Sequence, residues 1–132
     1  MENAFWIFAF VTALLVPGMM LFYGWLFLKE PPRDVNNSYG YRSPRSAKNK
    51  ETWAFAHAYA GRFWVRAGLA ALAVSVMWMA VTVSEYPNSA GRSVCILIFF
   101  QLVAALAVIP VTERALKREF DESGKRRRSD DI

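Results

Sequence analysis

The sequence contains very few of the residues from which metal centres and covalent cross-links are built. Its 132 residues include one cysteine, Cys95, and one histidine, His57. A lone cysteine excludes an intramolecular disulfide and a cysteine-based zinc site. A single histidine with scattered carboxylates is a weak signal for any other metal site. The sequence therefore predicts neither a metal centre nor another cofactor.

The patterns that mark common catalytic sites are also missing from the sequence. There is no Ser-His-acid combination, no Gly-rich phosphate loop and no pair of carboxylates inside a long apolar run. His57 lies in an aromatic-rich segment, Trp53 to Tyr59, where a lone histidine is more often a packing or interfacial residue than a catalyst. These observations do not favour an enzyme, and they leave the question open.

Charge is scarce in three long stretches of the chain. Hydrophobic residues make up 55% of the sequence, yet the mean hydropathy is only +0.17, because very apolar and very polar stretches alternate. A membrane-spanning helix needs about 20 apolar residues at ~1.5 Å rise each. The apolar stretches therefore predict membrane spans at about residues 4–28, 63–83 and 94–112.

The first apolar stretch is expected to be a retained helix and not a cleaved signal peptide. It runs for 25 residues without a charge, from Ala4 to Leu28, and the one charged side chain before it is the acidic Glu2. A signal peptide would have a basic amino end, a shorter apolar core and a small-x-small cleavage site. Pro17-Gly18 lies in the middle of this stretch, and in a bilayer such a pair more often kinks a helix than ends it.

The distribution of Lys and Arg predicts the orientation of the spans. Seven of these residues lie in the segment 29–62 and seven follow the third span, whereas one lies between the second and third spans and none precedes the first. Loops rich in Lys and Arg stay on the cytoplasmic side. We expect the amino end outside and the carboxyl end in the cytoplasm. The net charge of +5 then reflects topology, and nucleic-acid binding is not expected.

The predicted fold is all-α, with three transmembrane helices plus a cytoplasmic interfacial helix in one membrane domain over residues 1–124. Ser43-Pro44 resembles an N-cap followed by a first-turn proline, so a helix is expected from Arg45 to Ala60. At Gly61 this helix either runs on into the second span or bends. The third helix is expected to continue past the membrane towards Gly124, before a basic disordered tail over 125–132.

The predicted cytoplasmic segment 29–62 contains more polar and aromatic side chains than are needed to set the membrane orientation. Ser46, Asn49 and Trp53 have the i, i+3, i+7 spacing of one helix face, and Arg42 precedes them by a turn. Arginine side chains can hold a phosphate or a carboxylate. The alternative is a solvated basic loop that leads into an interfacial helix. The candidate binding residues are Tyr41, Arg42, Ser46, Asn49, Trp53, His57 and Glu113.

The same stretch resembles the SdpI family of bacterial membrane proteins. The family signature, G-Y-R-x-x-x-S-x-K-N-x-E-x-W with a later glycine, is matched here by Gly40-Tyr41-Arg42, Ser46, Lys48-Asn49, Glu51, Trp53 and Gly61. The segment from Ile109 to Glu113 resembles the closing part of the family pattern. The chain departs from the pattern at His57, where asparagine is expected, and at Ala47, where methionine is common.

The resemblance implies a role in immunity or sensing in a bacterial cytoplasmic membrane. The implied partners are membrane lipids, a secreted toxic peptide and a cytoplasmic regulator. The alternative is a small membrane enzyme or transporter that acts on a lipid headgroup, with Arg42, Ser46, Asn49 and His57 as its site. An enzyme needs a proton-transfer group in a water-accessible pocket, whereas a binding protein can lose His57 with little effect.

Two further features bear on packing and assembly. Arg66 and Glu113 are the charges nearest the cytoplasmic ends of their spans, and they either pair or reach the headgroups separately. Ala67, Ala71 and Ser75 form a ridge of small residues that permits close approach of another helix. This ridge packs either within the chain or between copies, and we expect a homo-oligomer.

Overall fold

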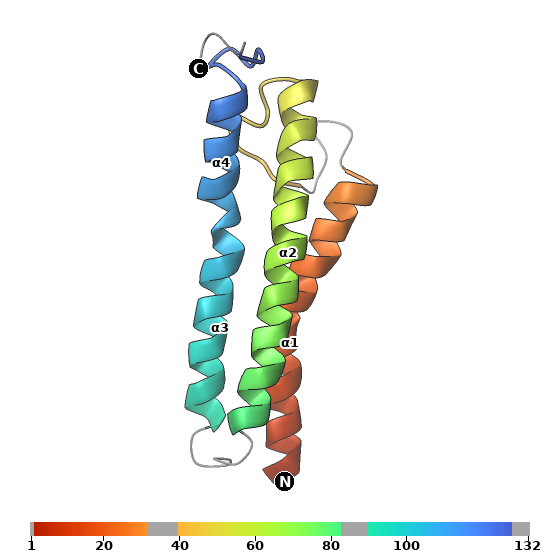
Figure 1. Ribbon diagram of the computed structural model, residues 1–132. Coiled ribbons are helices and arrows are strands. Elements are labelled where there is room, and N and C mark those ends of the chain that lie inside the picture. The colour runs from red at the N-terminus through yellow and green to blue at the C-terminus, as the bar shows by residue number, and fades with distance from the viewer. Residues whose placement is uncertain (1, 32–39, 83–89, 128–132) are drawn as a thin grey trace. The chain divides into compact units, whose positions relative to one another are not determined.

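The computed structural model describes residues 2–31, 40–82 and 90–127, and its regular elements are helices (Figure 1). They are α1 (Glu2–Lys29), α2 (Lys50–Thr82), α3 (Ala90–Leu106) and α4 (Val108–Glu119). Phe120 and Arg126 form an isolated antiparallel bridge after α4. The predicted all-α fold is confirmed.

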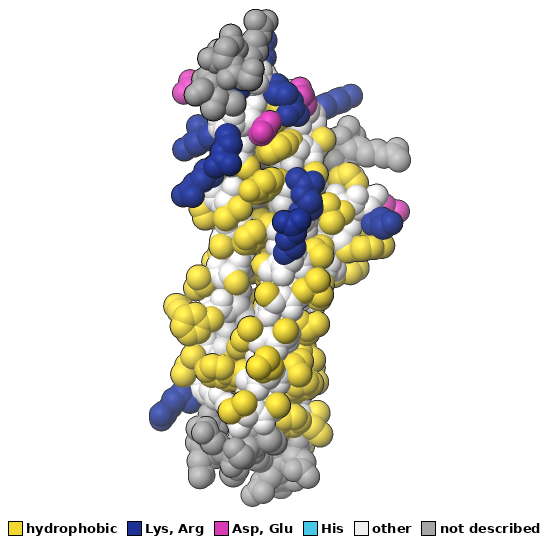
Figure 2. Space-filling model, in the orientation of Figure 1, with side chains coloured by type: hydrophobic (Ala, Val, Ile, Leu, Met, Phe, Trp, Pro, Cys, Tyr) yellow, Lys and Arg dark blue, Asp and Glu magenta, His cyan; other side chains and the backbone are white. Residues whose placement is uncertain are grey.

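Three helical stretches are long and apolar enough to cross a membrane. They are Ala4–Lys29, Lys50–Thr82 and Gly91–Glu119, the last of which runs through α3 and α4. Large apolar side chains such as Phe8, Met77 and Phe99 are more than 60% exposed. Figure 2 shows hydrophobic side chains spread over the visible parts of α2 and α3. Apolar surface on this scale requires an apolar solvent, so these helices identify a multi-pass membrane protein.

The chain forms two compact units of different charge. The first comprises Met1–Phe22 and Trp64–Leu106, and the second comprises Tyr23–Phe63 and Ala107–Ile132. Of the sixteen Lys and Arg residues, only Arg66 and Arg92 belong to the first unit. The expectation of a single membrane domain over residues 1–124 stays a prediction.

The core of the first unit is built from small residues of α1 and larger residues of α2 and α3. Its buried members are Ala9, Ala13, Met79, Val94 and Leu97. Alanine at two of these positions lets the helices approach closely, which is how helices commonly pack in membranes.

Gln101 of α3 compensates for the proline inside α1. Pro17 has no N–H, so the carbonyl of Ala13 loses its usual donor one turn later in the helix. The Gln101 Nε2 group donates to that carbonyl at 2.7 Å and to the Ser75 hydroxyl at 2.6 Å. A polar side chain from a neighbouring helix is one of the means by which proline is tolerated in a membrane span. α1 accordingly remains one helix from Glu2 to Lys29.

Replacing Gln101 should destabilise the first unit. Gln101→Leu leaves the Ala13 carbonyl without its donor in a buried site, and such a loss costs about 1–3 kcal/mol. We expect a lower midpoint in thermal unfolding of the detergent-solubilised protein, followed by circular dichroism. Leu102→Met, at an exposed position next along α3, is the control. Equal midpoints for the two variants would show that this hydrogen bond contributes nothing.

A second proline explains why the third span is interrupted. Pro110 cannot donate to the carbonyl of Leu106, and its ring crowds that carbonyl. α3 ends at Leu106 and α4 begins at Val108, after Ala107. The helix therefore does continue beyond α3, as expected, but after a break of one residue.

The start expected for the second helix is wrong by five residues. α2 begins at Lys50, not at Arg45, and runs through Gly61 to Thr82. Asn49 caps it: its Oδ1 accepts from the Thr52 N–H at 2.9 Å, and the Thr52 hydroxyl accepts from the Asn49 N–H at 3.1 Å. Ser43 instead closes a turn, in which its Oγ accepts from the Ser46 N–H at 3.1 Å.

The end of α4 is tied to the start of α2. α4 ends at Glu119, and Gly124 lies in the following turn with a φ of 90°, a conformation that favours glycine. The Asn49 Nδ2 group donates to the Gly124 carbonyl at 2.8 Å. The N–H of Arg127 donates to the Glu119 carbonyl at 2.8 Å. The expected disordered tail begins at Lys125, and its residues 128–132 lie outside the described part of the chain.

Candidate functional site

Tyr41 connects the loop before α2 to two helices of the second unit. Its backbone N–H donates to His57 Nε2 on α2 at 2.8 Å. Its hydroxyl donates to Glu113 Oε1 on α4 at 2.7 Å. These two bonds bring together residues that are 16 and 72 positions apart in the sequence. The loop is thereby fixed at a defined position against α2 and α4.

The Glu113 carboxylate lies between a phenol and a guanidinium group. Burial raises the pKa of the Tyr41 hydroxyl, and the hydrogen bond to Glu113 raises it further, so the phenol remains a neutral donor. Arg45 Nε lies 3.8 Å from Glu113 Oε2. Both charged side chains are partly exposed, at 32% and 24%. Arg66 belongs to the first unit, and its pairing with Glu113 stays a prediction.

His57 is fully buried and uses both ring nitrogens. Because Nε2 accepts the N–H of Tyr41, the ring proton is assigned to Nδ1, which lies 2.8 Å from the carbonyl oxygen of Trp53. The imidazole also contacts the rings of Trp53 and Phe27, at centroid distances of 4.4 and 5.0 Å. The assignment makes His57 a neutral side chain that holds the loop to α2.

Ser46 and Asn49 shape the turn that leads into α2. Ser46 is fully buried, and its Oγ accepts from the Ser43 N–H at 2.8 Å. The Thr52 hydroxyl donates to the Ser46 carbonyl at 3.0 Å. Because Ser46 and Asn49 precede the helix, they do not share a helix face with Trp53, contrary to the spacing argument. Thr52 was missed from sequence, since a single threonine between Glu51 and Trp53 carries no pattern.

Two arginines border this group of residues. The exposed Arg42 side chain lies over the buried Trp53 ring, 5.8 Å from its centroid, a cation–π distance. Arg45, beside Glu113, was not among the predicted site residues. We define the Tyr41 cluster as Tyr41, Arg42, Arg45, Trp53, His57 and Glu113. Five of the seven predicted residues belong to it, and Ser46 and Asn49 form the adjoining turn.

Metal binding receives no support from the described residues. Within residues 2–31, 40–82 and 90–127, no group of three or more His, Cys, Asp or Glu side chains could hold a metal ion. The Tyr41 cluster offers two guanidinium groups, that of Arg42 over the Trp53 ring and that of Arg45 beside Glu113. Guanidinium groups bind anionic ligands well.

Comparison with known proteins identifies a family that shares the segment carrying the Gly40-Tyr41-Arg42 motif. The model of the SdpI/YfhL protein family matches residues 33–112. The chain belongs to the SdpI/YfhL family. The matched region contains the whole Tyr41 cluster except Glu113, which directly follows it. The SdpI resemblance read from the Gly40-Tyr41-Arg42 motif is thus confirmed.

One curated relative within the SdpI/YfhL family extends the similarity over most of the chain. The uncharacterized protein YfhL of Bacillus subtilis (strain 168) is 28% identical over 108 residues, which cover 81% of this chain and 87% of that relative. No solved structure matches the chain.

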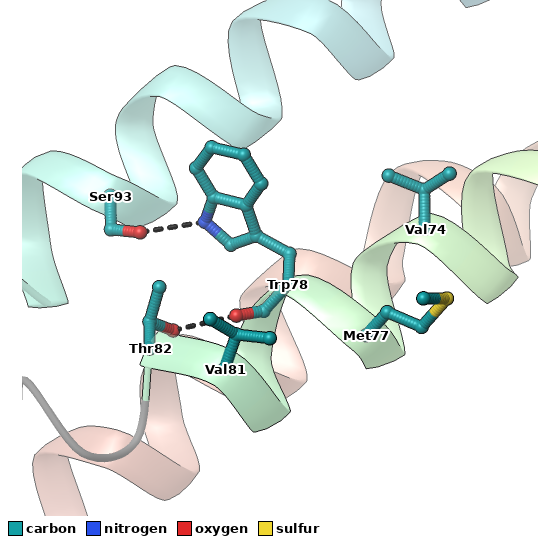
Figure 3. Close-up of a pocket in the computed structure, with 6 residues that line it drawn as sticks. All are labelled: Val74, Met77, Trp78, Val81, Thr82 and Ser93. Carbon is teal, nitrogen blue, oxygen red and sulfur yellow. Dashed lines mark hydrogen bonds between the residues drawn. The ribbon is translucent and has the colours of Figure 1, made fainter.

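A separate apolar cavity of about 470 Å³ lies in the first unit (Figure 3). Its lining residues are Val74, Met77, Trp78, Val81, Thr82 and Ser93. The Trp78 indole N–H donates to the Ser93 hydroxyl at 2.6 Å, and the Thr82 hydroxyl donates to the Trp78 carbonyl at 2.9 Å. The indole N–H and the threonine hydroxyl are therefore already paired, so the cavity offers mainly apolar surface.

Proposed function

We propose that this SdpI/YfhL-family protein binds a membrane-active toxic peptide, or a lipid, through the Tyr41 cluster, and so gives immunity or acts as a sensor. The observation that carries the proposal is the pair of hydrogen bonds from Tyr41 to His57 and Glu113. They fix the loop that bears Arg42 and Arg45. Two pre-positioned guanidinium groups bind a phosphate or carboxylate at little entropic cost.

The hydrogen bonds of His57 support a role in ligand binding and not in catalysis. A general base needs a nitrogen that can reach the reacting proton. In this cluster one ring nitrogen accepts from Tyr41 and the other is bonded to the Trp53 carbonyl. The raised pKa of Tyr41 likewise keeps its hydroxyl protonated. We therefore favour binding over the enzyme or transporter alternative.

The proposed site faces the cytoplasm. Fourteen of the sixteen Lys and Arg residues belong to the second unit, which also holds the Tyr41 cluster. Lys and Arg are retained on the cytoplasmic side of membrane proteins, and there they attract anionic lipids at about 1 kcal/mol per basic residue. A cytoplasmic regulator could reach the same surface.

A protection assay tests this function. Wild type and variants are expressed in a bacterium that is sensitive to a membrane-active peptide, and survival is measured against peptide concentration. Charge-assisted hydrogen bonds contribute about 1.5–3 kcal/mol, so Arg42→Ala should reduce protection at least about tenfold. Asn49→Ala should act in the same direction, because Asn49 fixes the adjoining turn.

Arg118→Ala, at an exposed position of α4, is the matched control and should protect like wild type. Membrane fractions must contain equal amounts of each variant. Binding of wild type to vesicles with and without phosphatidylglycerol then separates a lipid ligand from a peptide ligand. Full protection by Arg42→Ala would contradict the proposal.

A further inference from the structure

The described part of the chain ends in a hairpin, residues 120–127, which folds back on the second unit. Phe120 and Arg126 form the isolated antiparallel bridge that closes the hairpin. The N–H of Arg127 also donates to the Glu119 carbonyl at 2.8 Å. The hairpin lies outside the region that the family model matches. Its position is set by contacts with the start of α2 and with α4.

Two side chains at the start of α2 hold the hairpin in place. The Asn49 Nδ2 group donates to the Gly124 carbonyl at 2.8 Å, and Arg126 Nε donates to Glu51 Oε1 at the same distance. Arg126 Nη1 donates in addition to Glu119 Oε2 at 2.9 Å. The Arg126 guanidinium group thereby connects the start of α2 with the end of α4.

The contact with Asn49 requires glycine at position 124. Gly124 has a φ of 90°, a conformation that residues with a Cβ atom rarely adopt. A Cβ atom there would lie 2.7 Å from Asn49 Nδ2 and 3.0 Å from Lys48 Cβ. Because Asn49 also caps α2 through the Thr52 N–H, one side chain fixes both the helix start and the hairpin.

The hairpin is connected to both ends of the loop that carries the arginines of the Tyr41 cluster. Phe120 is 2% exposed and belongs to a buried apolar group formed with residues of α2 and α4. Tyr41, at the start of the loop, packs against this group. Asn49, at the end of the loop, is bonded to Gly124. A movement of the hairpin would therefore disturb the loop at both ends.

We propose that the hairpin is a latch that regulates the Tyr41 cluster: when docked it holds residues 41–49 in the conformation that binds ligand, and its release loosens them. The inference rests on the proposed function, since it concerns the regulation of the same site. The ion pairs of Arg126 are exposed and therefore weak, so the latch can open without unfolding of α2 or α4. Coupling between two parts of a protein is reciprocal, so a ligand that fixes the loop also fixes the hairpin. The hairpin is then the part through which a cytoplasmic regulator senses an occupied site.

Hydrogen exchange of the detergent-solubilised protein, measured by mass spectrometry, tests the latch without a ligand. Gly124→Ala places a Cβ atom against Asn49 and forces alanine into left-handed backbone. We expect the amides of residues 41–49 to exchange at least about tenfold faster than in wild type, while α3 keeps its protection. Glu122→Ala, at an exposed position of the same hairpin, is the control and should behave like wild type. Unchanged exchange of residues 41–49 in Gly124→Ala would overturn the proposal.

Asn49→Ser separates the latch from the helix cap. Serine can still cap α2, but it lacks the amide group that donates to Gly124. We expect faster exchange in the hairpin and in residues 41–48, whereas the first turn of α2 stays protected. A loosened hairpin beside an unchanged loop would show that the two are not coupled.

Tyr41→Phe tests the coupling in the reverse direction. This variant loses the hydroxyl bond to Glu113 and keeps the N–H bond to His57. Reciprocity predicts faster exchange of the Arg127 N–H, and an unchanged hairpin would contradict the latch.

Exchange and the protection assay separate this inference from the proposed function. Protection that does not depend on Arg42 would contradict the proposed function, even where the latch variants loosen the loop. Protection that depends on Arg42, together with unchanged exchange in Gly124→Ala and Asn49→Ser, would overturn the latch alone. We expect protection to depend on Arg42 and both latch variants to loosen the loop.

Discussion

Gly61→Val is expected to destabilise the second unit strongly. A Cβ atom at Gly61 would lie 3.0 Å from the Gly24 carbonyl oxygen, and 3.1 Å from Leu28 Cγ and from Phe27 Cβ. The backbone oxygen cannot move away without bending α1, and valine adds two methyl groups to the same crowded space. Overpacking typically costs about 1–3 kcal/mol and occasionally more, and this position should lie at the upper end.

Gly18→Val provides the matched control for this variant. A Cβ atom at Gly18 has nothing within 4 Å, so the same substitution there should be tolerated. We expect Gly61→Val to accumulate poorly in membranes and to be cleaved rapidly by trypsin in detergent, whereas Gly18→Val behaves like wild type. If the two variants unfold at the same temperature, the close approach of α2 to α1 at Gly61 is not required.

His57→Ala is expected to cost about 2–5 kcal/mol of folding free energy. The substitution leaves a cavity between Trp53 and Phe27, and it removes the acceptor of the Tyr41 N–H. The sequence alone favoured tolerance of this change in a binding protein. Because the buried histidine fixes the loop of the Tyr41 cluster, loss of protection in His57→Ala would reflect a displaced loop and not a missing catalyst.

His57→Gln distinguishes these two explanations. The glutamine carbonyl can still accept from the Tyr41 N–H, so this variant should regain part of the stability and of the protection. Both variants are compared with wild type by thermal unfolding in detergent and by the protection assay, with survival corrected for the amount of folded protein. A stable His57→Ala protein without protection would instead support the enzyme alternative.

The spans were predictable from sequence because length and hydropathy alone identify them. Twenty-five uncharged residues in a row at Ala4–Leu28 allow few other structures. The start of α2 was not predictable in the same way. Ser43-Pro44 satisfies the local rule for a helix start, but the serine hydroxyl is bonded within a turn, which serine favours as readily as a cap. Asn49 and Thr52 supply the cap instead.

The members of the site were partly predictable, and its contacts were not. The Gly40-Tyr41-Arg42 motif pointed to the segment in which the structure places most of the Tyr41 cluster. The contact between Tyr41 and Glu113 joins residues 72 positions apart, and that between Gln101 and Ala13 joins residues 88 apart. Local spacing carries no information on such pairs. The need of Ala13 for a new donor follows from Pro17, yet only the packed helices show that Gln101 provides it.

Cysteine accessibility tests most directly the central claim, that the Tyr41 cluster belongs to the cytoplasmic side of a three-span membrane protein. In a Cys95→Ser background, single cysteines are placed at Asn37, Ser89 and Ser129, which lie outside the described residues, and intact cells are treated with a membrane-impermeant thiol reagent. The proposed topology predicts labelling of Ser89→Cys in intact cells, and of Asn37→Cys and Ser129→Cys only after the membrane is opened. Labelling of Asn37→Cys from outside would contradict it.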